Sequence, residues 1–315
     1  MNRRFLWAAA ALAAGPYLGT MAWTGTVRGE EAFYEQQQSA AGKYSVWLDR
    51  GAGSYYMDME EYLTGVTAMQ IPADYEPETL KAQAIIARTY IRRQMEAAGT
   101  SEIAESALDL DYPEQKQLKE MWGSAAFPAY FEKVEEAVKA TEGQVLTYEG
   151  ELIDPMFFRL SAGMTRQGDF LHPYFQNVDC PEDMEAADFE ETMNFSYGEA
   201  AAAINSIPEG GAGPRQVSPR DLPEGIQIIS RDTAGYVEEI QIGNVVFTGE
   251  EIQYALGLSS SCFSVGASEE GLRFAVKGKG HGYGLSQHAA NEKARAGWTA
   301  EDILGYFYKN ISISE

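Results

Sequence analysis

The segment from Lys277 to Ala290, KGKGHGYGLSQHAA, holds the clearest candidates for chemistry in this sequence. Four glycines surround His281, and glycine allows the backbone to adopt positive φ and to approach a ligand closely. His281 is therefore predicted to orient a ligand or to support a neighbouring site residue. The alternative is structural, because the same glycines suit a tight strand-to-helix turn in which His281 caps the helix.

Ser286 and Gln287 open the helix that we expect over residues 285–296. Free backbone N–H groups at a helix N-terminus, together with polar side chains, can meet the oxygens of a ligand. The ring of Tyr283 could stack on the flat face of a ligand, whereas Tyr306 and Tyr308 are more typical of helix packing. His288 is expected at the surface.

The composition argues against one class of partner. Of the 315 residues, 45% are apolar and 23% are charged, which is ordinary for a globular protein with a core. The formal net charge is −23, and binding to a phosphate backbone needs a basic surface. We therefore expect no nucleic-acid partner, and an anionic polymer would have to be held by local groups in a cleft.

The N-terminal segment has the features of a membrane anchor. Arg3 and Arg4 precede an uncharged stretch from Phe5 to Val27, a charge order that leaves the N-terminus in the cytoplasm. The stretch is about long enough to cross a hydrocarbon core of ~30 Å. We predict a cytoplasmic tip and signal-anchor over residues 1–28, a juxtamembrane spacer over 29–43 and one domain over 44–310 outside the cytoplasm. A cleaved signal peptide is the alternative.

The elements that must position the site follow from periodicity. Apolar residues at three- and four-residue spacing predict a long helix over residues 78–99, and a hairpin is expected over 44–55. An acidic loop and a Gly/Pro-rich loop or hinge are expected at 179–191 and 200–221. Further helices are predicted over 131–140, 250–256 and 300–308, and strands over 144–148, 152–160, 225–230, 236–242, 244–248 and 273–277. No alternating βαβ pattern is present, so we predict an α+β fold of mixed helices and small antiparallel sheets.

The cysteines and histidines are few. Cys180 and Cys262 lie in the part predicted to be outside the cytoplasm. Two alternatives are open there: the cysteines form a disulfide, or they are two free, buried thiols. The sequence has three histidines and no CxxC spacing, from which we predict no metal site.

Two long segments resemble the stage II sporulation protein D (SpoIID) / LytB family of Gram-positive, endospore-forming bacteria. The first runs from Tyr62 to Tyr90, YLTGVTAMQIPADYEPETLKAQAIIARTY, and the second is the Lys277–Ala290 segment. TEGQVLTY, at residues 141–148, stands between them as the family pattern requires. The resemblance covers roughly residues 44–308.

The resemblance implies a SpoIID/LytB-like fold with a central glycan cleft, no cofactor, and a role in peptidoglycan remodelling during sporulation. Members look like lytic transglycosylases that cleave glycan strands already stripped of stem peptides, and the LytB branch is known as an amidase enhancer. The expected partners are glycan strands, a wall amidase and membrane sporulation proteins at the septal or engulfing membrane. The residues expected to contact glycan are Tyr75, Tyr283, Ser286 and Gln287.

One residue departs from the family at the position of its general acid. The family has glutamate in A-x-E-[MI]-P, and this chain has Gln70. Glycosidic cleavage needs an acid to protonate the leaving oxygen, and an amide has no proton to release. We therefore predict that Gln70 holds glycan without cutting it. The alternative is that a nearby carboxylate, such as Asp74 or Glu76, serves instead.

A second departure lies at residues 157–165, FFRLSAGMT, where Phe158 occupies a family histidine position and Ser161 a serine or cysteine position. Some members bind zinc there. Three hypotheses stay open: a lytic transglycosylase with a replaced or relocated acid, a glycan-binding scaffold that recruits or stimulates a wall amidase, and a structural protein of the spore envelope. Gln70 and His281 are predicted to face one cleft.

Overall fold

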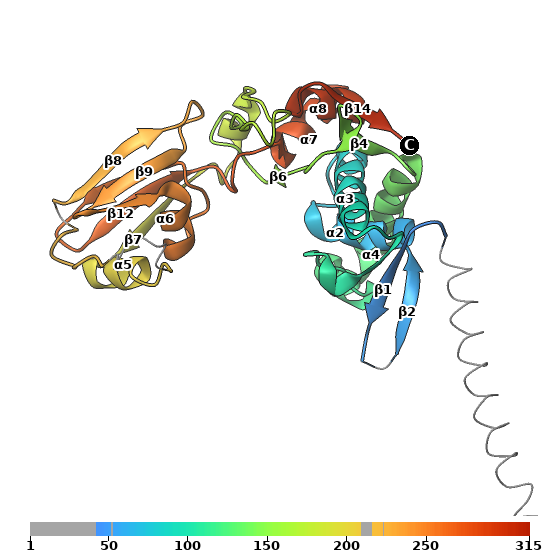
Figure 1. Ribbon diagram of the computed structural model, residues 1–315, viewed down its shortest axis with the longest axis horizontal. Helices are drawn as coiled ribbons and strands as arrows, with labels where there is room; N and C mark the ends of the chain where they lie inside the picture. Colours follow the sequence, from blue (N-terminus) through green and yellow to red (C-terminus); the bar gives the residue numbers. More distant parts are fainter. Residues whose placement is uncertain (1–41, 52, 209–215, 223) are drawn as a thin grey trace, which may run out of the picture. The chain divides into compact units, whose positions relative to one another are not determined.

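The computed structural model describes residues 42–51, 53–208, 216–222 and 224–315 (Figure 1). Its contacts divide the chain into two compact units. In the described part, the first unit comprises residues 42–62 and 94–111, and the second comprises residues 63–93 together with the chain from Tyr112 onward. The predicted anchor at 1–28 and nearly all of the predicted spacer at 29–43 lie outside the described residues. Within the described residues, no helix is both long and apolar enough to cross a membrane.

The first unit contains the predicted hairpin. Strand β1 (Ser45–Asp49) pairs antiparallel with β2 (Ser54–Asp58) and parallel with β3 (Glu102–Ala104), and the short 3-10 helix η1 (Glu105–Ala107) follows. The hairpin is confirmed, and β3 adds a parallel strand that the sequence pattern did not indicate. Arg50 and Glu105 form an ion pair within this unit.

Two helices carry the first family-like segment. Helix α2 (Met59–Gln70) ends at Gln70, and α3 (Pro77–Ala98) confirms the predicted long helix, with proline at its first position as expected. The predicted stripe on α3 is buried throughout: Leu80, Ala84, Ala87, Ile91 and Met95. Helix α4 (Gln115–Ala140) begins well before the predicted residue 131, and its interior backbone leaves helical geometry at Gly123.

A core cluster fixes the end of α2. Ala68 and Ile71 pack with Leu80 of α3 and with Leu118 and Val134 of α4. Burying such side chains stabilises a fold by about 1.5–3 kcal/mol each for the larger ones. The main chain at Gln70 is therefore held between a buried alanine and a buried isoleucine.

The C-terminal helices and three short pairings form a second core around α3. Strand β4 (Val145–Tyr148) pairs antiparallel with β5 (Glu151–Leu152) and with β14 (Ile311–Ser314), and β6 (Phe157–Phe158) pairs parallel with β13 (Leu285–Ser286). Helices α7 (Gln287–Arg295) and α8 (Ala300–Phe307) follow. Ile85, Leu285, Ala289 and Leu304 share one buried cluster. The capping box of Thr299 and Asp302 is present at the start of α8.

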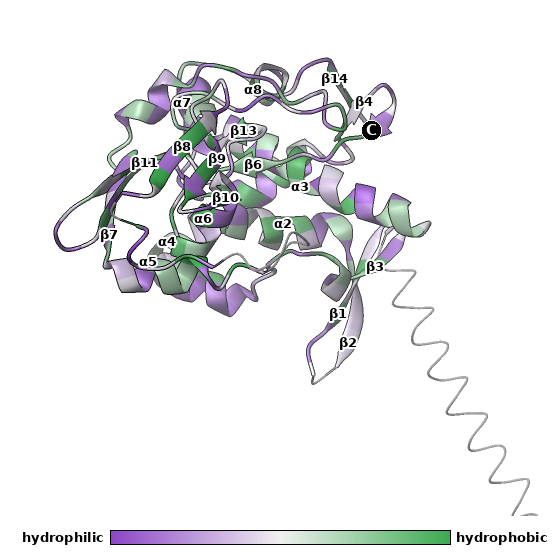
Figure 2. Ribbon diagram, turned by 60° about the vertical axis from the view of Figure 1, so that its left-hand side comes forward, coloured by the Kyte–Doolittle hydropathy of each residue, from purple (hydrophilic) through white to green (hydrophobic). Residues whose placement is uncertain are grey.

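The strands from β7 to β12 build two sheets with helices beside them (Figure 1). Strand β9 (Val237–Ile242) lies between β8 (Ile226–Arg231) and β10 (Val245–Thr248), and β12 (Leu272–Lys277) lies between β7 (Glu190–Phe195) and β11 (Phe263–Ala267). Helices α5 (Tyr197–Ile204) and α6 (Gly249–Leu256) bury apolar residues in the same cluster as these strands. Hydrophobic and hydrophilic residues mix along β8 and β9, as Figure 2 shows, because the strands bury one face.

The observed class is α+β, as predicted, and most of its strand pairs are antiparallel. Three local predictions were wrong. Residues 152–160 form two short strands instead of one, because the chain makes separate pairings at β5 and β6. Residues 200–204 belong to helix α5, which Ser196 and Glu199 cap. The acidic stretch contains the 3-10 helix η2 (Pro181–Glu185) and the start of β7. Cys180 and Cys262 are free and buried.

Candidate functional site

Gln70 belongs to a cluster of three glutamine side chains, which we call the glutamine cluster: Gln70, Gln83 and Gln287. Gln83 on α3 donates through Nε2 to Oε1 of Gln70 at 2.8 Å. Gln287 at the start of α7 donates through Nε2 to the main-chain carbonyl of Gln70 at 2.7 Å and to Oε1 of Gln83 at 3.1 Å. Gln83 and Gln287 are buried, whereas Gln70 is half-buried. The cluster thus joins α2, α3 and α7 at Gln70, the residue that was predicted to replace the family acid.

The cluster leaves the side-chain amino group of Gln70 unused. Within the described chain, its Oε1 and main-chain oxygen accept hydrogen bonds, and its Nε2 makes none. Because Gln70 is half-buried, this amino group can donate to the oxygen of a ligand. The arrangement can bind an oxygen atom, but it offers no proton for transfer.

The turn after α2 places Tyr75 beside charged groups. The Tyr75 N–H donates to the carbonyl of Pro72 at 3.1 Å, and the next amide, Glu76 N–H, donates to Asn291 Oδ1 on α7 at 2.7 Å. Burial raises the pKa of the Tyr75 hydroxyl, and the nearby charges of Arg159 and Asp183 also act on it. Tyr75 therefore lies within electrostatic reach of a carboxylate on η2.

That carboxylate is the centre of a second cluster, the Asp183 cluster: Asp183, Ser161, Ser286 and His288. Asp183 is fully buried. Its Oδ2 accepts from the Ser161 N–H at 2.8 Å and from the Ser286 hydroxyl at 2.7 Å, and its Oδ1 lies 3.1 Å from His288 Nδ1. A buried carboxylate is tolerated when its oxygens accept several hydrogen bonds, as they do here.

Helix α7 connects the two clusters at its first turn. Three consecutive residues make these contacts. Ser286 and His288 hydrogen-bond to Asp183, and Gln287 between them hydrogen-bonds to Gln70. The predicted contact residue Gln287 is thus joined to Gln70, whereas the hydroxyl of Ser286 is buried and occupied by Asp183. His288 was expected at the surface, and its side chain lies there only in part, because it is 24% exposed and its ring contacts Asp183.

The His288–Asp183 pair predicts a pH-dependent stability. The hydrogen bond to Asp183, together with the charges of Asp183, Glu292 and Asp188, raises the pKa of His288 above 6.5, although burial opposes the shift. A raised pKa in the folded state means stability that is full below the unfolded pKa of about 6.5 and is lost as the pH rises through the folded value. Replacing His288→Asn should remove this component, so the free energy of unfolding should fall less between pH 6 and pH 8.5 in the variant than in the wild type.

Urea unfolding at several pH values measures this difference, and His172→Asn is the matched control. His172 also lies beside a carboxylate, at 2.9 Å from Asp169, but that carboxylate is exposed. A His288→Asn variant whose stability keeps the wild-type pH dependence would contradict the role given to the Asp183 pair.

His281 is held inside the glycine-rich turn by backbone groups. Its Nε2 lies 3.0 Å from the carbonyl of Phe157, and its Nδ1 accepts the N–H of Tyr283 at 3.0 Å. This pattern requires the neutral ring with the proton on Nε2. Burial also lowers the pKa of His281, which favours the neutral form. Backbone groups of the turn occupy both ring nitrogens, and this favours the structural alternative over the orientation of a ligand or the support of a site residue.

Replacing His281→Ala should therefore lower stability more than it affects binding. Two hydrogen bonds and the ring contacts with Phe158 and Tyr283 are lost, for which we expect about 2–4 kcal/mol of unfolding free energy. Chemical denaturation measures the loss, and His172→Ala serves as the control at a histidine with an exposed partner. A His281→Ala variant of normal stability that fails to bind glycan would instead assign His281 to the ligand.

Tyr283 lies in a different environment from the glutamine cluster. Its ring stacks on His281 at a centroid distance of 6.1 Å, and the guanidinium of Arg166 lies 4.5 Å from its centroid. Tyr283 lines a cavity of about 320 Å³ together with Met156, Gln167, Gly168, Asp169, His172 and Phe175. An aromatic ring beside polar side chains is typical of a binding pocket. Gln70 and His281 make no mutual hydrogen bond in the described residues, so their shared cleft stays a prediction.

The resemblance implies that some family members bind zinc at residues 157–165, and the side chains found there do not fit a metal. Phe158, at the position where the resemblance implies a histidine, packs edge-on against His281 with ring centroids 5.5 Å apart. Cys180 is buried, and burial raises the pKa of its thiol to about 12, whereas a metal ligand must be a thiolate. Among the residues that the structure describes, no group of three or more His, Cys, Asp or Glu side chains is placed to hold a metal ion.

Comparisons with known proteins identify one matching family and several relatives. The family described as "Stage II sporulation protein" matches residues 53–148. Stage II sporulation protein D of Bacillus subtilis (strain 168) is 31% identical over 268 residues, which cover 82% of this chain and 74% of that protein. Its namesake in Bacillus amyloliquefaciens is 32% identical over 276 residues, with the same shares. An uncharacterized protein of Brachyspira hyodysenteriae is 25% identical over 269 residues, covering 82% of this chain and 67% of that protein.

Proposed function

The chain belongs to the stage II sporulation protein D family, and from this premise we propose that it binds peptidoglycan glycan strands at Gln70 without cleaving them. The observation that carries the proposal is the glutamine cluster. Gln83 and Gln287 hold Gln70 in place with its Nε2 free to donate, so the position binds oxygen but supplies no acid. Membership of the family supports the cell wall as the setting of this function.

The surroundings of Gln70 support binding of a sugar. Tyr75 follows Gln70 by five residues, and its half-buried ring offers an apolar face with a polar tip. Arg159 and Asp183 lie within electrostatic reach of its hydroxyl. Aromatic rings and side chains that donate and accept hydrogen bonds are the groups that recognise a sugar's faces and hydroxyls. We place the predicted central glycan cleft around these residues.

A strand-binding assay tests this function. The full chain is mixed with glycan strands that have been stripped of stem peptides, and the fraction of protein that sediments with the strands is measured. We expect binding, and we expect Tyr75→Ala to weaken it. Failure of the wild type to bind would overturn the proposal and favour the structural role in the spore envelope. Binding would leave open whether the protein also recruits or stimulates a wall amidase, as the LytB branch does.

An enzyme with a relocated acid is the second candidate, and one observation favours it. His288 is a titratable group with a raised pKa, held by a buried carboxylate one residue from Gln287. A protonated imidazole can act as a general acid. If the wild type cleaves strands, His288→Asn should abolish cleavage while leaving binding intact, and cleavage that survives in His288→Asn would exclude this residue as the acid.

A further inference from the structure

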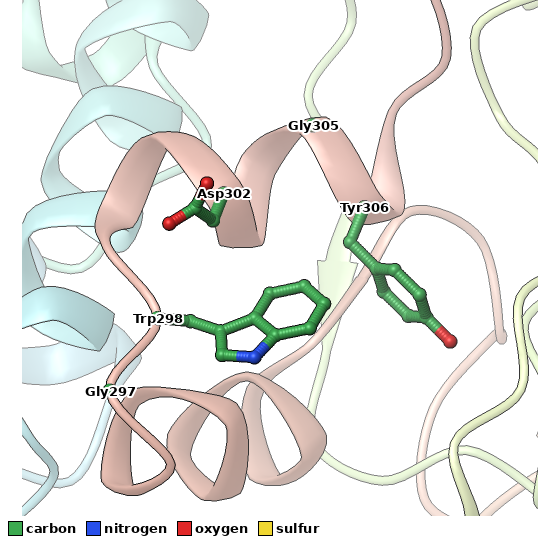
Figure 3. Close-up of a pocket in the computed structure, with 5 residues that line it drawn as sticks. All are labelled: Gly297, Trp298, Asp302, Gly305 and Tyr306. Atoms are coloured by element: carbon green, nitrogen blue, oxygen red, sulfur yellow. The ribbon is translucent and has the colours of Figure 1, made fainter.

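An open hollow lies at the connection between α7 and α8. Its volume is about 490 Å³, and its lining residues are Gly297, Trp298, Asp302, Gly305 and Tyr306 (Figure 3). Sites for small ligands are typically about 300–1,000 Å³. None of these residues belongs to the glutamine cluster, to the Asp183 cluster or to the cavity beside Tyr283, so the hollow is a separate feature of the molecule.

Gly305 lines this hollow, and the packing around it does not require a glycine. It lies inside α8, where glycine costs roughly 0.5–1 kcal/mol relative to alanine. A Cβ atom added at Gly305 would meet nothing within 4 Å, and its backbone has no positive φ. Neither the fold nor the local conformation therefore requires glycine here. Its missing side chain leaves open space at the lining of the hollow.

The two aromatic rings form a fixed platform. Trp298 and Tyr306 meet edge to face, with centroids 5.5 Å apart. The ammonium of Lys293 lies 4.3 Å from the centroid of Tyr306 and 5.3 Å from that of Trp298, and it pairs with Glu182 at 3.0 Å. The Tyr306 hydroxyl donates to the Asp179 carbonyl at 2.6 Å. Rings held in this way lose little conformational entropy when a ligand stacks on them.

Asp302 supplies a hydrogen-bond acceptor at the rim. Its Oδ2 caps the helix by accepting from Thr299 N–H at 3.1 Å and Thr299 Oγ1 at 2.7 Å. Its Oδ1 accepts no hydrogen bond from the described part of the chain. In Figure 3 the carboxylate and the phenol ring flank the indole of Trp298. The nearby cation, Lys293, is buried and paired, so the rim carries negative charge and disfavours an anionic ligand.

We propose that this hollow binds a neutral pyranose ring of a glycan strand, with the ring face on Trp298 and a hydroxyl on Asp302. The inference rests on the proposed function and adds a second point of contact to it. Helix α7 carries Gln287 at its first residue and leads to Trp298, and the helix rises by about 1.5 Å per residue. One strand of several sugars could therefore contact both ends of α7.

The test uses neutral oligomers of N-acetylglucosamine as the probe, titrated into the full chain and followed by calorimetry. Gly305→Leu fills the hollow, and the matched control is Gly198→Leu, which places the same side chain at an exposed helical glycine where a Cβ likewise meets nothing within 4 Å. We expect Gly305→Leu to weaken binding about tenfold, equivalent to about 1.4 kcal/mol, and Gly198→Leu to leave it unchanged. Asp302→Asn, which keeps the shape of the cap, should weaken binding less.

The outcomes separate this inference from the function on which it rests. If the wild type binds neither the oligomers nor stripped glycan strands, the proposed function fails and the inference fails with it. If the wild type binds strands but not neutral oligomers, or if Gly305→Leu binds the oligomers as tightly as Gly198→Leu does, the inference is wrong while the proposed function stands. Thermal unfolding of both leucine variants confirms that they are folded.

Discussion

Replacing Gln70→Glu is expected to start cleavage of stripped glycan strands, because a general acid contributes about 10²- to 10⁴-fold to the rate of such a reaction. The physical reason is the geometry of the glutamine cluster. Gln83 Nε2 donates to Oε1 of Gln70, and a carboxyl group in the same place can accept that bond through one oxygen. Its other oxygen then occupies the position of the free Nε2 and can carry the proton that a leaving glycosidic oxygen needs. Mass spectrometry of the released anhydro-muramyl products measures the change.

Two observations would show that the introduced carboxyl acts as the general acid. Gln70→Ala should stay inactive, because it has no acid, and its glycan binding should weaken. The activity of Gln70→Glu should fall as the pH rises through the pKa of the introduced carboxyl, since only the protonated form can donate. A Gln70→Glu protein that binds strands and never cleaves them would show that the acid is not the only missing part, and would direct attention to Phe158 and Ser161.

Replacing Asp183→Ala is expected to lower the free energy of unfolding by roughly 3–5 kcal/mol, which is the cost of removing one partner from a buried charged network. Asp183 is fully buried and accepts from the Ser161 N–H, the Ser286 hydroxyl and the His288 ring. Its removal leaves two buried donors without a partner and loosens the first turn of α7, which also carries Gln287. Urea unfolding measures the loss.

Asp188→Ala is the matched control for this loss. Asp188 also pairs with cations, Lys279 at 2.8 Å and Arg159 at 3.6 Å, but its side chain is 43% exposed. Exposed ion pairs typically contribute about 0–1 kcal/mol, so the control should lose little. Equal losses in the two variants would mean that the Asp183 cluster does not hold the site together.

The sequence predicted the parts of the fold that depend on local patterns. The long helix α3 and its buried stripe follow from the spacing of apolar residues alone. The two strands at residues 145–148 and 237–242 were also predicted within two residues. The parallel pairing of β6 with β13 was not, because its partners lie 128 residues apart (285 − 157) and each strand is two residues long. Such pairings are set by tertiary packing and leave no periodic signal.

Only part of the candidate site was predicted, because the contacts between its residues are also set by tertiary packing. Gln70 and Gln287 were identified from the motifs, and the structure joins them. Asp183 was missed because it stands in an acidic stretch, where nothing in the sequence distinguishes the buried carboxylate from its exposed neighbours. Gln83 could have been found, since it is a polar residue three positions after Leu80 on the buried side of α3. Its burial required a polar partner, and Gln70 is that partner.

The most direct test of the account is the fate of stripped glycan strands incubated with the wild-type protein. Strand length and end groups are measured by mass spectrometry on the same samples in which binding is measured by sedimentation. We expect strands that are bound and unchanged, because Gln70 holds an oxygen and supplies no proton. Anhydro-muramyl ends produced by the wild type would contradict it, and their loss in His288→Asn would then identify the relocated acid.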